Sequence, residues 1–416
     1  HIPPDTLHTG QTFDSKKFTA ADLPFETLTT DDRCFVLGAG ADMTPDAAER
    51  FLEPPVYMAV GERIGEHAAN LADGRPAVGT VAAASSAGAG AETGDCRELP
   101  CSFRPMPANA PVVDMPPESP ADIADVQLVV AGGGTGGAPA GIAATRENID
   151  TLVLEAQGKL GGVGTVGLIA NYYHGYRGGF TAEMDAGITE LTAPERTGGK
   201  GFDVEAKPYW YLREIDDAGG KIWFHALTYG TTVENGRIGG ALVATPFGCG
   251  RVRCSVAVDA TGNADMAAAA GAPCITVGAE HVAVQGTGLS PRTPGINYSN
   301  TDHTFIDDSD LLDIWRAIVA AQAKYRTQYD LSSIVNSRQR RQIVGDFTVS
   351  PLDVICNRTY PDTIVTAVSN FDSHGYTVHP VFSLKPPDRE EMQAHLPFRS
   401  LLPQDVDGLM VTGLGI

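Results

Sequence analysis

The sequence lacks a long hydrophobic run and an excess of basic charge, and each absence excludes a class of protein. No stretch approaches the roughly 18 apolar residues that a membrane-spanning helix needs, and no basic-then-apolar signal pattern opens the chain. The 30 basic residues are outnumbered by 51 acidic ones. The resulting net charge of -21 disfavours nucleic acid and anionic membranes as partners. The composition predicts a soluble protein, cytoplasmic or secreted.

Cysteine and several catalytic motifs are also scarce. Seven cysteines are too few for a disulfide scaffold in 416 residues, and they form no CxxC. The pairs Cys96/Cys101 and Cys249/Cys254 are spaced to close short loops, although separate thiols packed as small apolar side chains are favoured. The sequence has no GxSxG, HExxH or P-loop, and its histidines are scattered. Hydrolase and metalloenzyme functions therefore lose support, and no metal is predicted.

Organisation along the chain is uneven. Residues 1–120 form an extension rich in proline, glycine and alanine whose role the sequence does not indicate. Its low-complexity stretch, residues 78–95, is typical of a loop or disordered segment. The chain begins with His1 rather than Met, which suggests processing, a cleaved tag or a fragment of a longer precursor.

Regular structure is predicted from Val126, where a strand, a glycine turn, a helix and a second strand follow one another up to Glu155. The turn contains GxGxxG at Gly132, Gly134 and Gly137. These glycines permit a tight turn, bring backbone N–H groups to a pyrophosphate and let helix and strand pack closely. Glu155 follows the first glycine by roughly 20 residues, where an acid binds the adenosine ribose. The unit therefore predicts dinucleotide binding.

A second glycine cluster, Gly161, Gly162 and Gly164, follows Glu155, and a nicotinamide domain does not require it. With "VAVDATGNADMAAAAGA" at 256–272, these motifs resemble the FAD-dependent oxidoreductases of the glutathione-reductase structural type. Two further segments, 338–354 and 360–376, resemble a subgroup of large FAD proteins within that family. The resemblance covers the chain from Val126 onward and implies FAD as the cofactor. It assigns FAD binding to Gly132, Gly134, Thr135, Gly137, Glu155, Gly161, Gly162, Gly164, Thr165, Thr261, Gly262, Gly413 and Gly415.

The resemblance implies an α/β fold with a Rossmann-type FAD-binding domain, three-layered and with a mostly parallel sheet, assembled from discontinuous segments. We assign residues 121–180, 220–275 and 400–416 to that domain, and 181–219 and 276–399 to an inserted α+β substrate domain. Within these, an "NG" turn at 235–236 predicts a hairpin, and 307–326 predicts an amphipathic helix.

The C-terminal "GLMVTG" resembles the last strand of the FAD domain, which returns to the sheet and opens a helix facing the flavin. We expect the remainder of that domain on a second polypeptide, so that the chain is one subunit of a nicked heteromer. Cleavage after Ile416 by strain-assisted self-attack, by a protease or by truncation would each leave this terminus.

Catalysis beside a flavin requires groups that move protons, because the isoalloxazine itself takes the hydride. His374 and Asp372 are the first candidates, as an acid–base histidine and the carboxylate that orients it, and D-x-H recurs here in the resembled subgroup. Tyr173, His174 and Arg177 follow the second glycine cluster and are candidates for substrate binding. Arg338 and Arg341 are expected in salt bridges or at a substrate carboxylate.

These features favour an oxidase or dehydrogenase that takes a hydride from a small, hydroxylated organic substrate. Two alternatives stay open at this point. One is a flavin-dependent, redox-neutral lyase or isomerase with His374 as base, and the other is a non-catalytic FAD-binding subunit.

Overall fold

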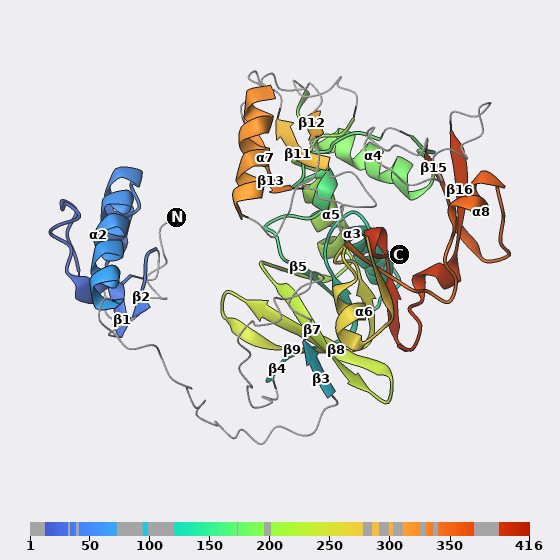
Figure 1. Ribbon diagram of the computed structural model, residues 1–416, viewed down its shortest axis with the longest axis horizontal. Coiled ribbons are helices and arrows are strands. Elements are labelled where there is room, and N and C mark those ends of the chain that lie inside the picture. The colour runs from blue at the N-terminus through green and yellow to red at the C-terminus, as the bar shows by residue number, and fades with distance from the viewer. Residues whose placement is uncertain are drawn as a thin grey trace. The chain divides into compact units, whose positions relative to one another are not determined.

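A computed structural model describes most of the chain (Figure 1). The described residues are 13–31, 34–38, 41–72, 95–98, 120–172, 174–194, 201–277, 285–290, 299–302, 311–324, 330–335, 340–369 and 391–416. The chain divides into two compact units, residues 1–85 and 86–416. Each unit is considered by itself.

The N-terminal unit has a small core of its own. It contains strands β1 (Thr29–Asp31) and β2 (Cys34–Phe35) and helices α1 (Pro45–Phe51) and α2 (Pro54–Ala72). Thr44 caps α1, and its side chain accepts a hydrogen bond from the Ala47 N–H. Leu23, Phe51 and Val60 are completely buried. Packed structure here was not expected from the sequence, in which the low-complexity stretch dominates; residues 78–94 of that stretch lie outside the described residues.

The second unit is built on a parallel sheet. Its strands, in spatial order, are β6 (Lys221–Phe224), β5 (Thr151–Glu155), β4 (Asp122–Ala131), β9 (Gly248–Asp259) and β17 (Leu409–Val411). Helix α3 (Gly137–Arg146) connects β4 to β5. The predicted strand–helix–strand unit is thus confirmed, as is the return of the C-terminal strand to this sheet. Because β4 is central and parallel, the turns that follow β4, β9 and β17 meet at one edge.

An antiparallel extension continues the sheet beyond β9. It consists of β8 (Arg237–Thr245), β7 (Leu227–Glu234) and β3 (Asp95–Glu98). The predicted hairpin between β7 and β8 is confirmed, with positive φ at Asn235 and Gly236 as a type I′ turn requires. Along β9, Val252 pairs with Ala241 of β8 whereas Ala257 pairs with Leu409 of β17, so one long strand joins both parts.

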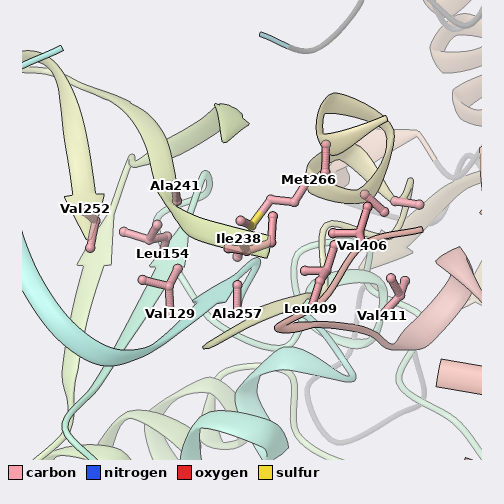
Figure 2. Close-up of a cluster of buried hydrophobic side chains, with 14 of the residues drawn as sticks. Val129, Leu154, Ile238, Ala241, Val252, Ala257, Met266, Val406, Leu409 and Val411 are labelled. Carbon is pink, nitrogen blue, oxygen red and sulfur yellow. The ribbon is translucent and has the colours of Figure 1, made fainter. Parts of the chain in front are cut away.

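Side chains that alternate along the strands enter two hydrophobic cores. Leu128 and Val130 point to a core completed by α3, α4 (Phe180–Leu191) and α5 (Ala206–Asp217), where Trp210 is buried. Val129 and Leu154 point to the opposite core, which Figure 2 shows together with Ile238 of β8, Met266 of α6 (Asp265–Ala270) and Leu409 of β17. Residues 181–219, assigned above to the substrate domain, thus contribute α4 and α5 to the first core. The expected α/β fold, with its mostly parallel Rossmann-type sheet, is confirmed.

The remaining described segments form small antiparallel sheets. The pairs are β10 (Cys274–Val277) with β14 (Arg340–Ile343), and β15 (Thr363–Ser369) with β16 (Met392–Pro397). Strand β11 (Gln285–Ser290) lies between β12 (Ser299–Asp302) and β13 (Asp330–Val335). Helix α7 (Leu311–Lys324) confirms the predicted amphipathic helix, although Leu311 and Trp315 of its apolar face are exposed. Helix α8 (Pro351–Ile355) precedes β15. The domain boundaries stay predictions.

The structure also bears on membrane-spanning helices and on the cysteines. Among the described helices, none combines the length and the apolar character that crossing a membrane demands. Cys249 and Cys254 are free thiols, in agreement with the favoured interpretation, whereas Cys101 lies outside the described residues.

Candidate functional site

The turn between β4 and α3 has no room for a side chain at Gly132 or Gly137, the first and last glycines of its motif. Gly132 has a φ of +96°, and a Cβ atom on Gly137 would lie 1.7 Å from the Gly132 carbonyl oxygen. The same atom would lie 2.8 Å from Cβ of Ala260, which follows β9. Helix α3 therefore starts directly against two strands, with the N–H groups of its first turn at the sheet edge, where they suit a phosphate.

Glu155 ends β5 beside this turn. One carboxylate oxygen accepts a hydrogen bond from the Gly133 N–H at 2.7 Å, and the other accepts one from the Gln157 N–H at 2.7 Å. Burial raises the pKa of this carboxyl, an effect that the Gln157 and Gly133 N–H groups oppose. Each oxygen retains a further lone pair, so a ribose hydroxyl can still be bound.

The second glycine segment, residues 161–164, packs against the first glycine turn, residues 132–137. A Cβ atom on Gly162 would lie 3.1 Å from Cα of Gly134, and the Gly161 N–H donates to the Gly133 carbonyl at 2.8 Å. The Thr135 hydroxyl donates in turn to the Gly161 carbonyl at 3.3 Å. Gly162 and Gly164 bound the short 3-10 helix η3 (Gly162–Gly164). Bare backbone is thus needed where these two loops touch.

Thr165 closes this segment and is completely buried. Its hydroxyl donates to the Leu160 carbonyl at 2.6 Å. The side chain therefore stabilises the loop from within, and its assignment to FAD stays a prediction.

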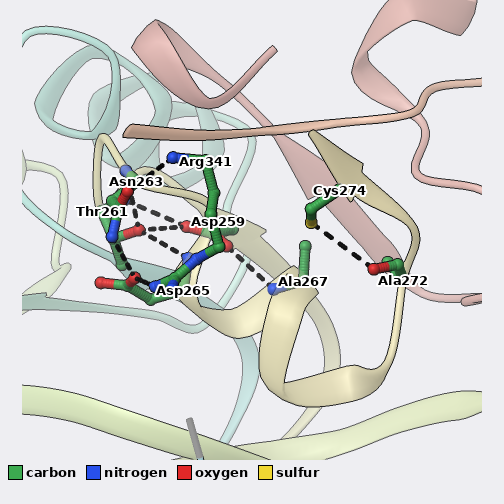
Figure 3. A network of polar contacts seen from close by, with 8 residues as sticks. All are labelled: Asp259, Thr261, Asn263, Asp265, Ala267, Ala272, Cys274 and Arg341. Atoms are coloured by element: carbon green, nitrogen blue, oxygen red, sulfur yellow. Dashed lines mark hydrogen bonds and ion pairs between the residues drawn. The ribbon is translucent and has the colours of Figure 1, made fainter. Parts of the chain in front are cut away.

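A third loop follows β9 and is held by a buried carboxylate (Figure 3). Asp259 accepts hydrogen bonds from the Thr261 hydroxyl at 2.8 Å, from the Thr261 N–H at 3.1 Å and from the Ala267 N–H at 3.0 Å. Burial raises the pKa of Asp259, and these three donors oppose the rise. Gly262 has a φ of +78°, and no atom lies within 4 Å of the position of a Cβ there. The hydrogen bonds to Asp259 therefore hold the loop in place, while the Gly262 Cβ position has open space around it.

Arg341 of β14 braces the same loop (Figure 3). Its guanidinium forms an ion pair with Asp265 at 2.5 Å, and its backbone N–H donates to the Asn263 side-chain oxygen at 2.8 Å. Arg341 is 7% exposed. The salt bridge foreseen for Arg341 is therefore present, and it is buried rather than on the surface. Arg338 lies outside the described residues.

The turn after β17 completes the cluster of loops. Gly413 begins the 3-10 helix η7 (Gly413–Gly415), with a φ of +73° and open space where a Cβ would lie. A Cβ on Gly136 would lie 3.1 Å from the Thr412 side chain, and one on Gly415 would lie 3.1 Å from the Ala264 backbone nitrogen. This turn thus touches both the first and the third loop.

These four segments fit a dinucleotide. Glycines stand where backbones meet, and open space surrounds the Cβ positions of Gly262 and Gly413. N–H groups of the first turn of α3 suit a pyrophosphate, and Glu155 suits a ribose. Among the described residues, no group of histidine, cysteine and acidic side chains is arranged to hold a metal ion.

The loop after the second glycine segment, which contains Tyr172, His174 and Tyr176, carries a histidine–carboxylate pair. Nδ1 of His174 lies 2.7 Å from a carboxylate oxygen of Glu391. A carboxylate only accepts, so Nδ1 of His174 donates the proton of this hydrogen bond. Tyr176 accepts a hydrogen bond from Gln393 at 2.8 Å. The loop therefore lies against the start of β16.

The other predicted residues of this loop have different positions. Arg177 is bound to Asp185 of α4 at 2.6 Å, so its charge is already compensated. Tyr173, His374 and Asp372 lie outside the described residues, and their roles stay predictions.

Sequence reasoning overlooked three residues of the site. Asp259 is the aspartate of "DATG" at 259–262, a pattern that by itself indicates no role for this side chain. Glu391 and Lys207 carry no local signal, because their partners His174 and Tyr172 lie 217 and 35 residues away.

Comparison with known proteins supplies a family. The model of the family described as FAD dependent oxidoreductase matches residues 127–333 and 311–416, which together are more than half of the chain. A comparison with curated proteins finds no match.

Solved structures resemble parts of the chain at low identity and low TM-score. A geranylgeranyl bacteriochlorophyll reductase-like protein from Thermoplasma acidophilum has 14% identity and a TM-score of 0.33, over 50% of this chain and 65% of its own. The OxyS anhydrotetracycline hydroxylase from Streptomyces rimosus has 13% identity and a TM-score of 0.37, over 54% of this chain and 55% of its own. The chain spans less than two thirds of each of these structures, and such similarities indicate no reaction.

The family match and the convergence of its glycine loops agree with the resemblance drawn from the sequence. The match does not single out the glutathione-reductase type within the family. The chain belongs to the family of FAD-dependent oxidoreductases, and FAD is its cofactor.

Proposed function

We propose that the chain oxidises a small organic substrate that carries a hydroxyl group, as an oxidase or dehydrogenase. Bound FAD supplies the acceptor for the hydride. The observation that carries the proposal is the His174–Glu391 pair, at 2.7 Å, in the loop that follows the second glycine segment.

The chain's own residues supply the proton transfer. Removing a hydride from a carbon that bears a hydroxyl requires a base for the hydroxyl proton. Nε2 of His174 takes that proton, and Glu391 orients the ring and stabilises the imidazolium that forms. Glu391 is 56% exposed and His174 is 27% exposed at the side chain, so the pair is open to a ligand.

Anaerobic mixing tests the proposal. The FAD-loaded protein is mixed with a panel of secondary alcohols, 2-hydroxy acids and primary amines, and the flavin absorbance is recorded. Bleaching by one class, slowed about 100-fold or more in His174→Gln, is the expected result. His395→Gln is the matched control, because His395 hydrogen-bonds to Thr366 on the surface of the β15–β16 pair.

Two other outcomes would replace the proposal. Turnover with neither bleaching nor an added acceptor would indicate a redox-neutral lyase or isomerase. Bleaching that is unchanged in both His174→Gln and His374→Ala would place the chemistry outside these residues, as expected for a non-catalytic FAD-binding subunit.

A further inference from the structure

A buried amine lies behind the second glycine segment. Lys207, in the first turn of α5, is 2% exposed. Its Nζ donates a hydrogen bond to the Tyr172 hydroxyl at 3.1 Å and lies 3.8 Å from the centre of the Phe202 ring. A lysine is seldom buried unless it is paired with a charge, and here its closest polar partner is a neutral phenol.

The amine also touches the FAD-binding segment. A Cβ atom on Gly164 would lie 3.8 Å from Nζ of Lys207 and 3.2 Å from the Phe202 ring. Gly162, in the same 3-10 helix, packs on Gly134 of the first glycine turn. Lys207 therefore lies against the second glycine segment, which in turn packs on the first glycine turn.

The charged and titratable groups around Lys207 are few. From α4, the Asp185 carboxylate attracts the ammonium, but one of its oxygens is already bound to Arg177. From α5, Tyr211 presents its ring at 5.8 Å. From the loop, Tyr172 is half-buried and stacks under the Arg177 guanidinium at 5.0 Å. Within the described part of the chain, these surroundings hold one carboxylate, two phenols and the Arg177 guanidinium.

These surroundings allow the Lys207 amine to be either protonated or neutral. Burial lowers the pKa of Lys207 to about 8, although Asp185 acts in the opposite direction. Burial raises the pKa of the Tyr172 hydroxyl, which therefore stays protonated.

We propose that Lys207 is a proton-holding residue, which takes up one proton when the bound FAD is reduced and releases it on reoxidation. Reduction would add negative charge to the bound FAD, and a cation behind the second glycine segment would compensate that charge. The Tyr172 hydroxyl relays the proton: it gives its own hydrogen to the neutral amine and takes another from solvent. The inference rests on the proposed function only in requiring redox chemistry at FAD.

A redox titration of the FAD-loaded full chain tests the coupling without a substrate. The midpoint potential is measured between pH 6 and pH 10 in wild type, Lys207→Met and Lys207→Arg. Above pH 8, the wild-type slope should correspond to one more proton per two electrons than the slope of either variant. Lys221→Met is the matched control, since Lys221 pairs with Asp150 on the surface, and it should keep the wild-type slope. Equal slopes in all four proteins would overturn the proposal.

A second measurement follows the titration of Lys207 by NMR in the wild-type protein, so it does not require that a variant binds FAD. The chain has eight lysines, so 13C labelling at Cε gives few signals to follow. One signal, absent from Lys207→Arg, should titrate near pH 8 in oxidised protein and at higher pH after reduction with dithionite. A midpoint that does not move on reduction, or the absence of any lysine that titrates below pH 9.5, would contradict the inference. Neither experiment involves substrate oxidation, so a failure here is distinct from a failure of the proposed function.

Discussion

At the residue scale, the site combines glycines at close backbone contacts with a long, buried lysine side chain. Glycines at 132, 137 and 162 remove atoms where backbones approach one another, and Gly137 has the least space of the three. Lys207 instead places a long polar side chain inside an aromatic cage. Both choices disfavour folding relative to ordinary core residues, and both lie next to the cofactor loops.

Gly137→Ala should abolish FAD binding. Its Cβ would lie 1.7 Å from the Gly132 carbonyl oxygen, so α3 must move away from the turn and its N–H groups are displaced. Gly65→Ala is the control, because no atom lies within 4 Å of the added methyl group in α2. It should stabilise the protein by about 0.5–1 kcal/mol, since alanine favours helix. Quenching of FAD fluorescence and thermal melts measure the two effects. Wild-type FAD affinity in Gly137→Ala would contradict the geometry.

Lys207→Met should not destabilise the protein at pH 7. The folded-state pKa of Lys207, about 8, lies below the ordinary lysine pKa of 10.5, so the unfolded chain binds more protons between these values. Wild-type stability therefore rises with pH across this window, whereas that of the variant has no such dependence. Methionine retains the apolar contacts and removes a buried charge. Urea unfolding at pH 7 and pH 10 should show wild type gaining on the order of 2 kcal/mol relative to Lys207→Met. No relative change with pH would show that the amine is not buried in solution.

At the scale of elements, the cofactor site depends on strands and loops that brace one another from distant parts of the chain. Strand β14 holds the loop after β9 through Arg341, although 76 residues separate Arg341 from Asp265. Strand β17 inserts beside β9 and brings Gly413 to the same edge. Each of these contacts fixes a loop of the candidate cofactor site.

Arg341→Met should loosen the loop that contains Thr261 and Gly262. The change leaves Asp265, 21% exposed at its side chain, without its guanidinium partner. We expect a loss of about 2 kcal/mol in the free energy of unfolding and FAD binding weakened about tenfold. Arg358→Met is the control, because Arg358 is 55% exposed and pairs with Asp353 away from these loops. Equal FAD affinity in the two variants would show that β14 does not brace the loop.

Helix α8 offers a prediction for acid pH. The Ser350 hydroxyl, the Ser350 N–H and Arg358, in that order, lower the pKa of Asp353 to about 2. Because the folded-state pKa is depressed, the stabilisation by Asp353 is complete above its unfolded value and is lost as pH falls toward 2. Asp353→Asn should lower the free energy of unfolding by about 1 kcal/mol at pH 5 and by less at pH 3. Denaturant titrations at both pH values test this, and a difference that grows toward pH 3 would contradict the sign.

At the scale of the whole molecule, the sequence predicts what is encoded locally. The glycine spacing, the acid at Glu155 and the "DATG" motif indicated the FAD fold because each lies within one strand–turn–helix unit. The His174–Glu391 pair joins residues 217 positions apart, and no local pattern indicates such a contact. Lys207 was overlooked for a related reason, since a lysine in the first turn of a helix is ordinarily solvated. The N-terminal unit escaped prediction because Leu23 and Met43 of its core come from irregular segments.

The division into two units yields a prediction of its own. Every glycine loop of the site, and each residue that braces those loops, belongs to residues 86–416, whereas residues 1–85 bury a separate core around Phe51 and Val60. A chain reduced to residues 86–416 should therefore bind FAD with a Kd within about threefold of the full chain, because no loop of the site is removed. Gly137→Ala in the shortened chain is the matched control and should remove binding in the same assay. Residues 1–85 alone should give a helical circular dichroism spectrum with a cooperative melt, since α1 and α2 pack on their own core. If the shortened chain folds but loses FAD, the N-terminal unit contributes to the cofactor site, and the independence of the two units is wrong.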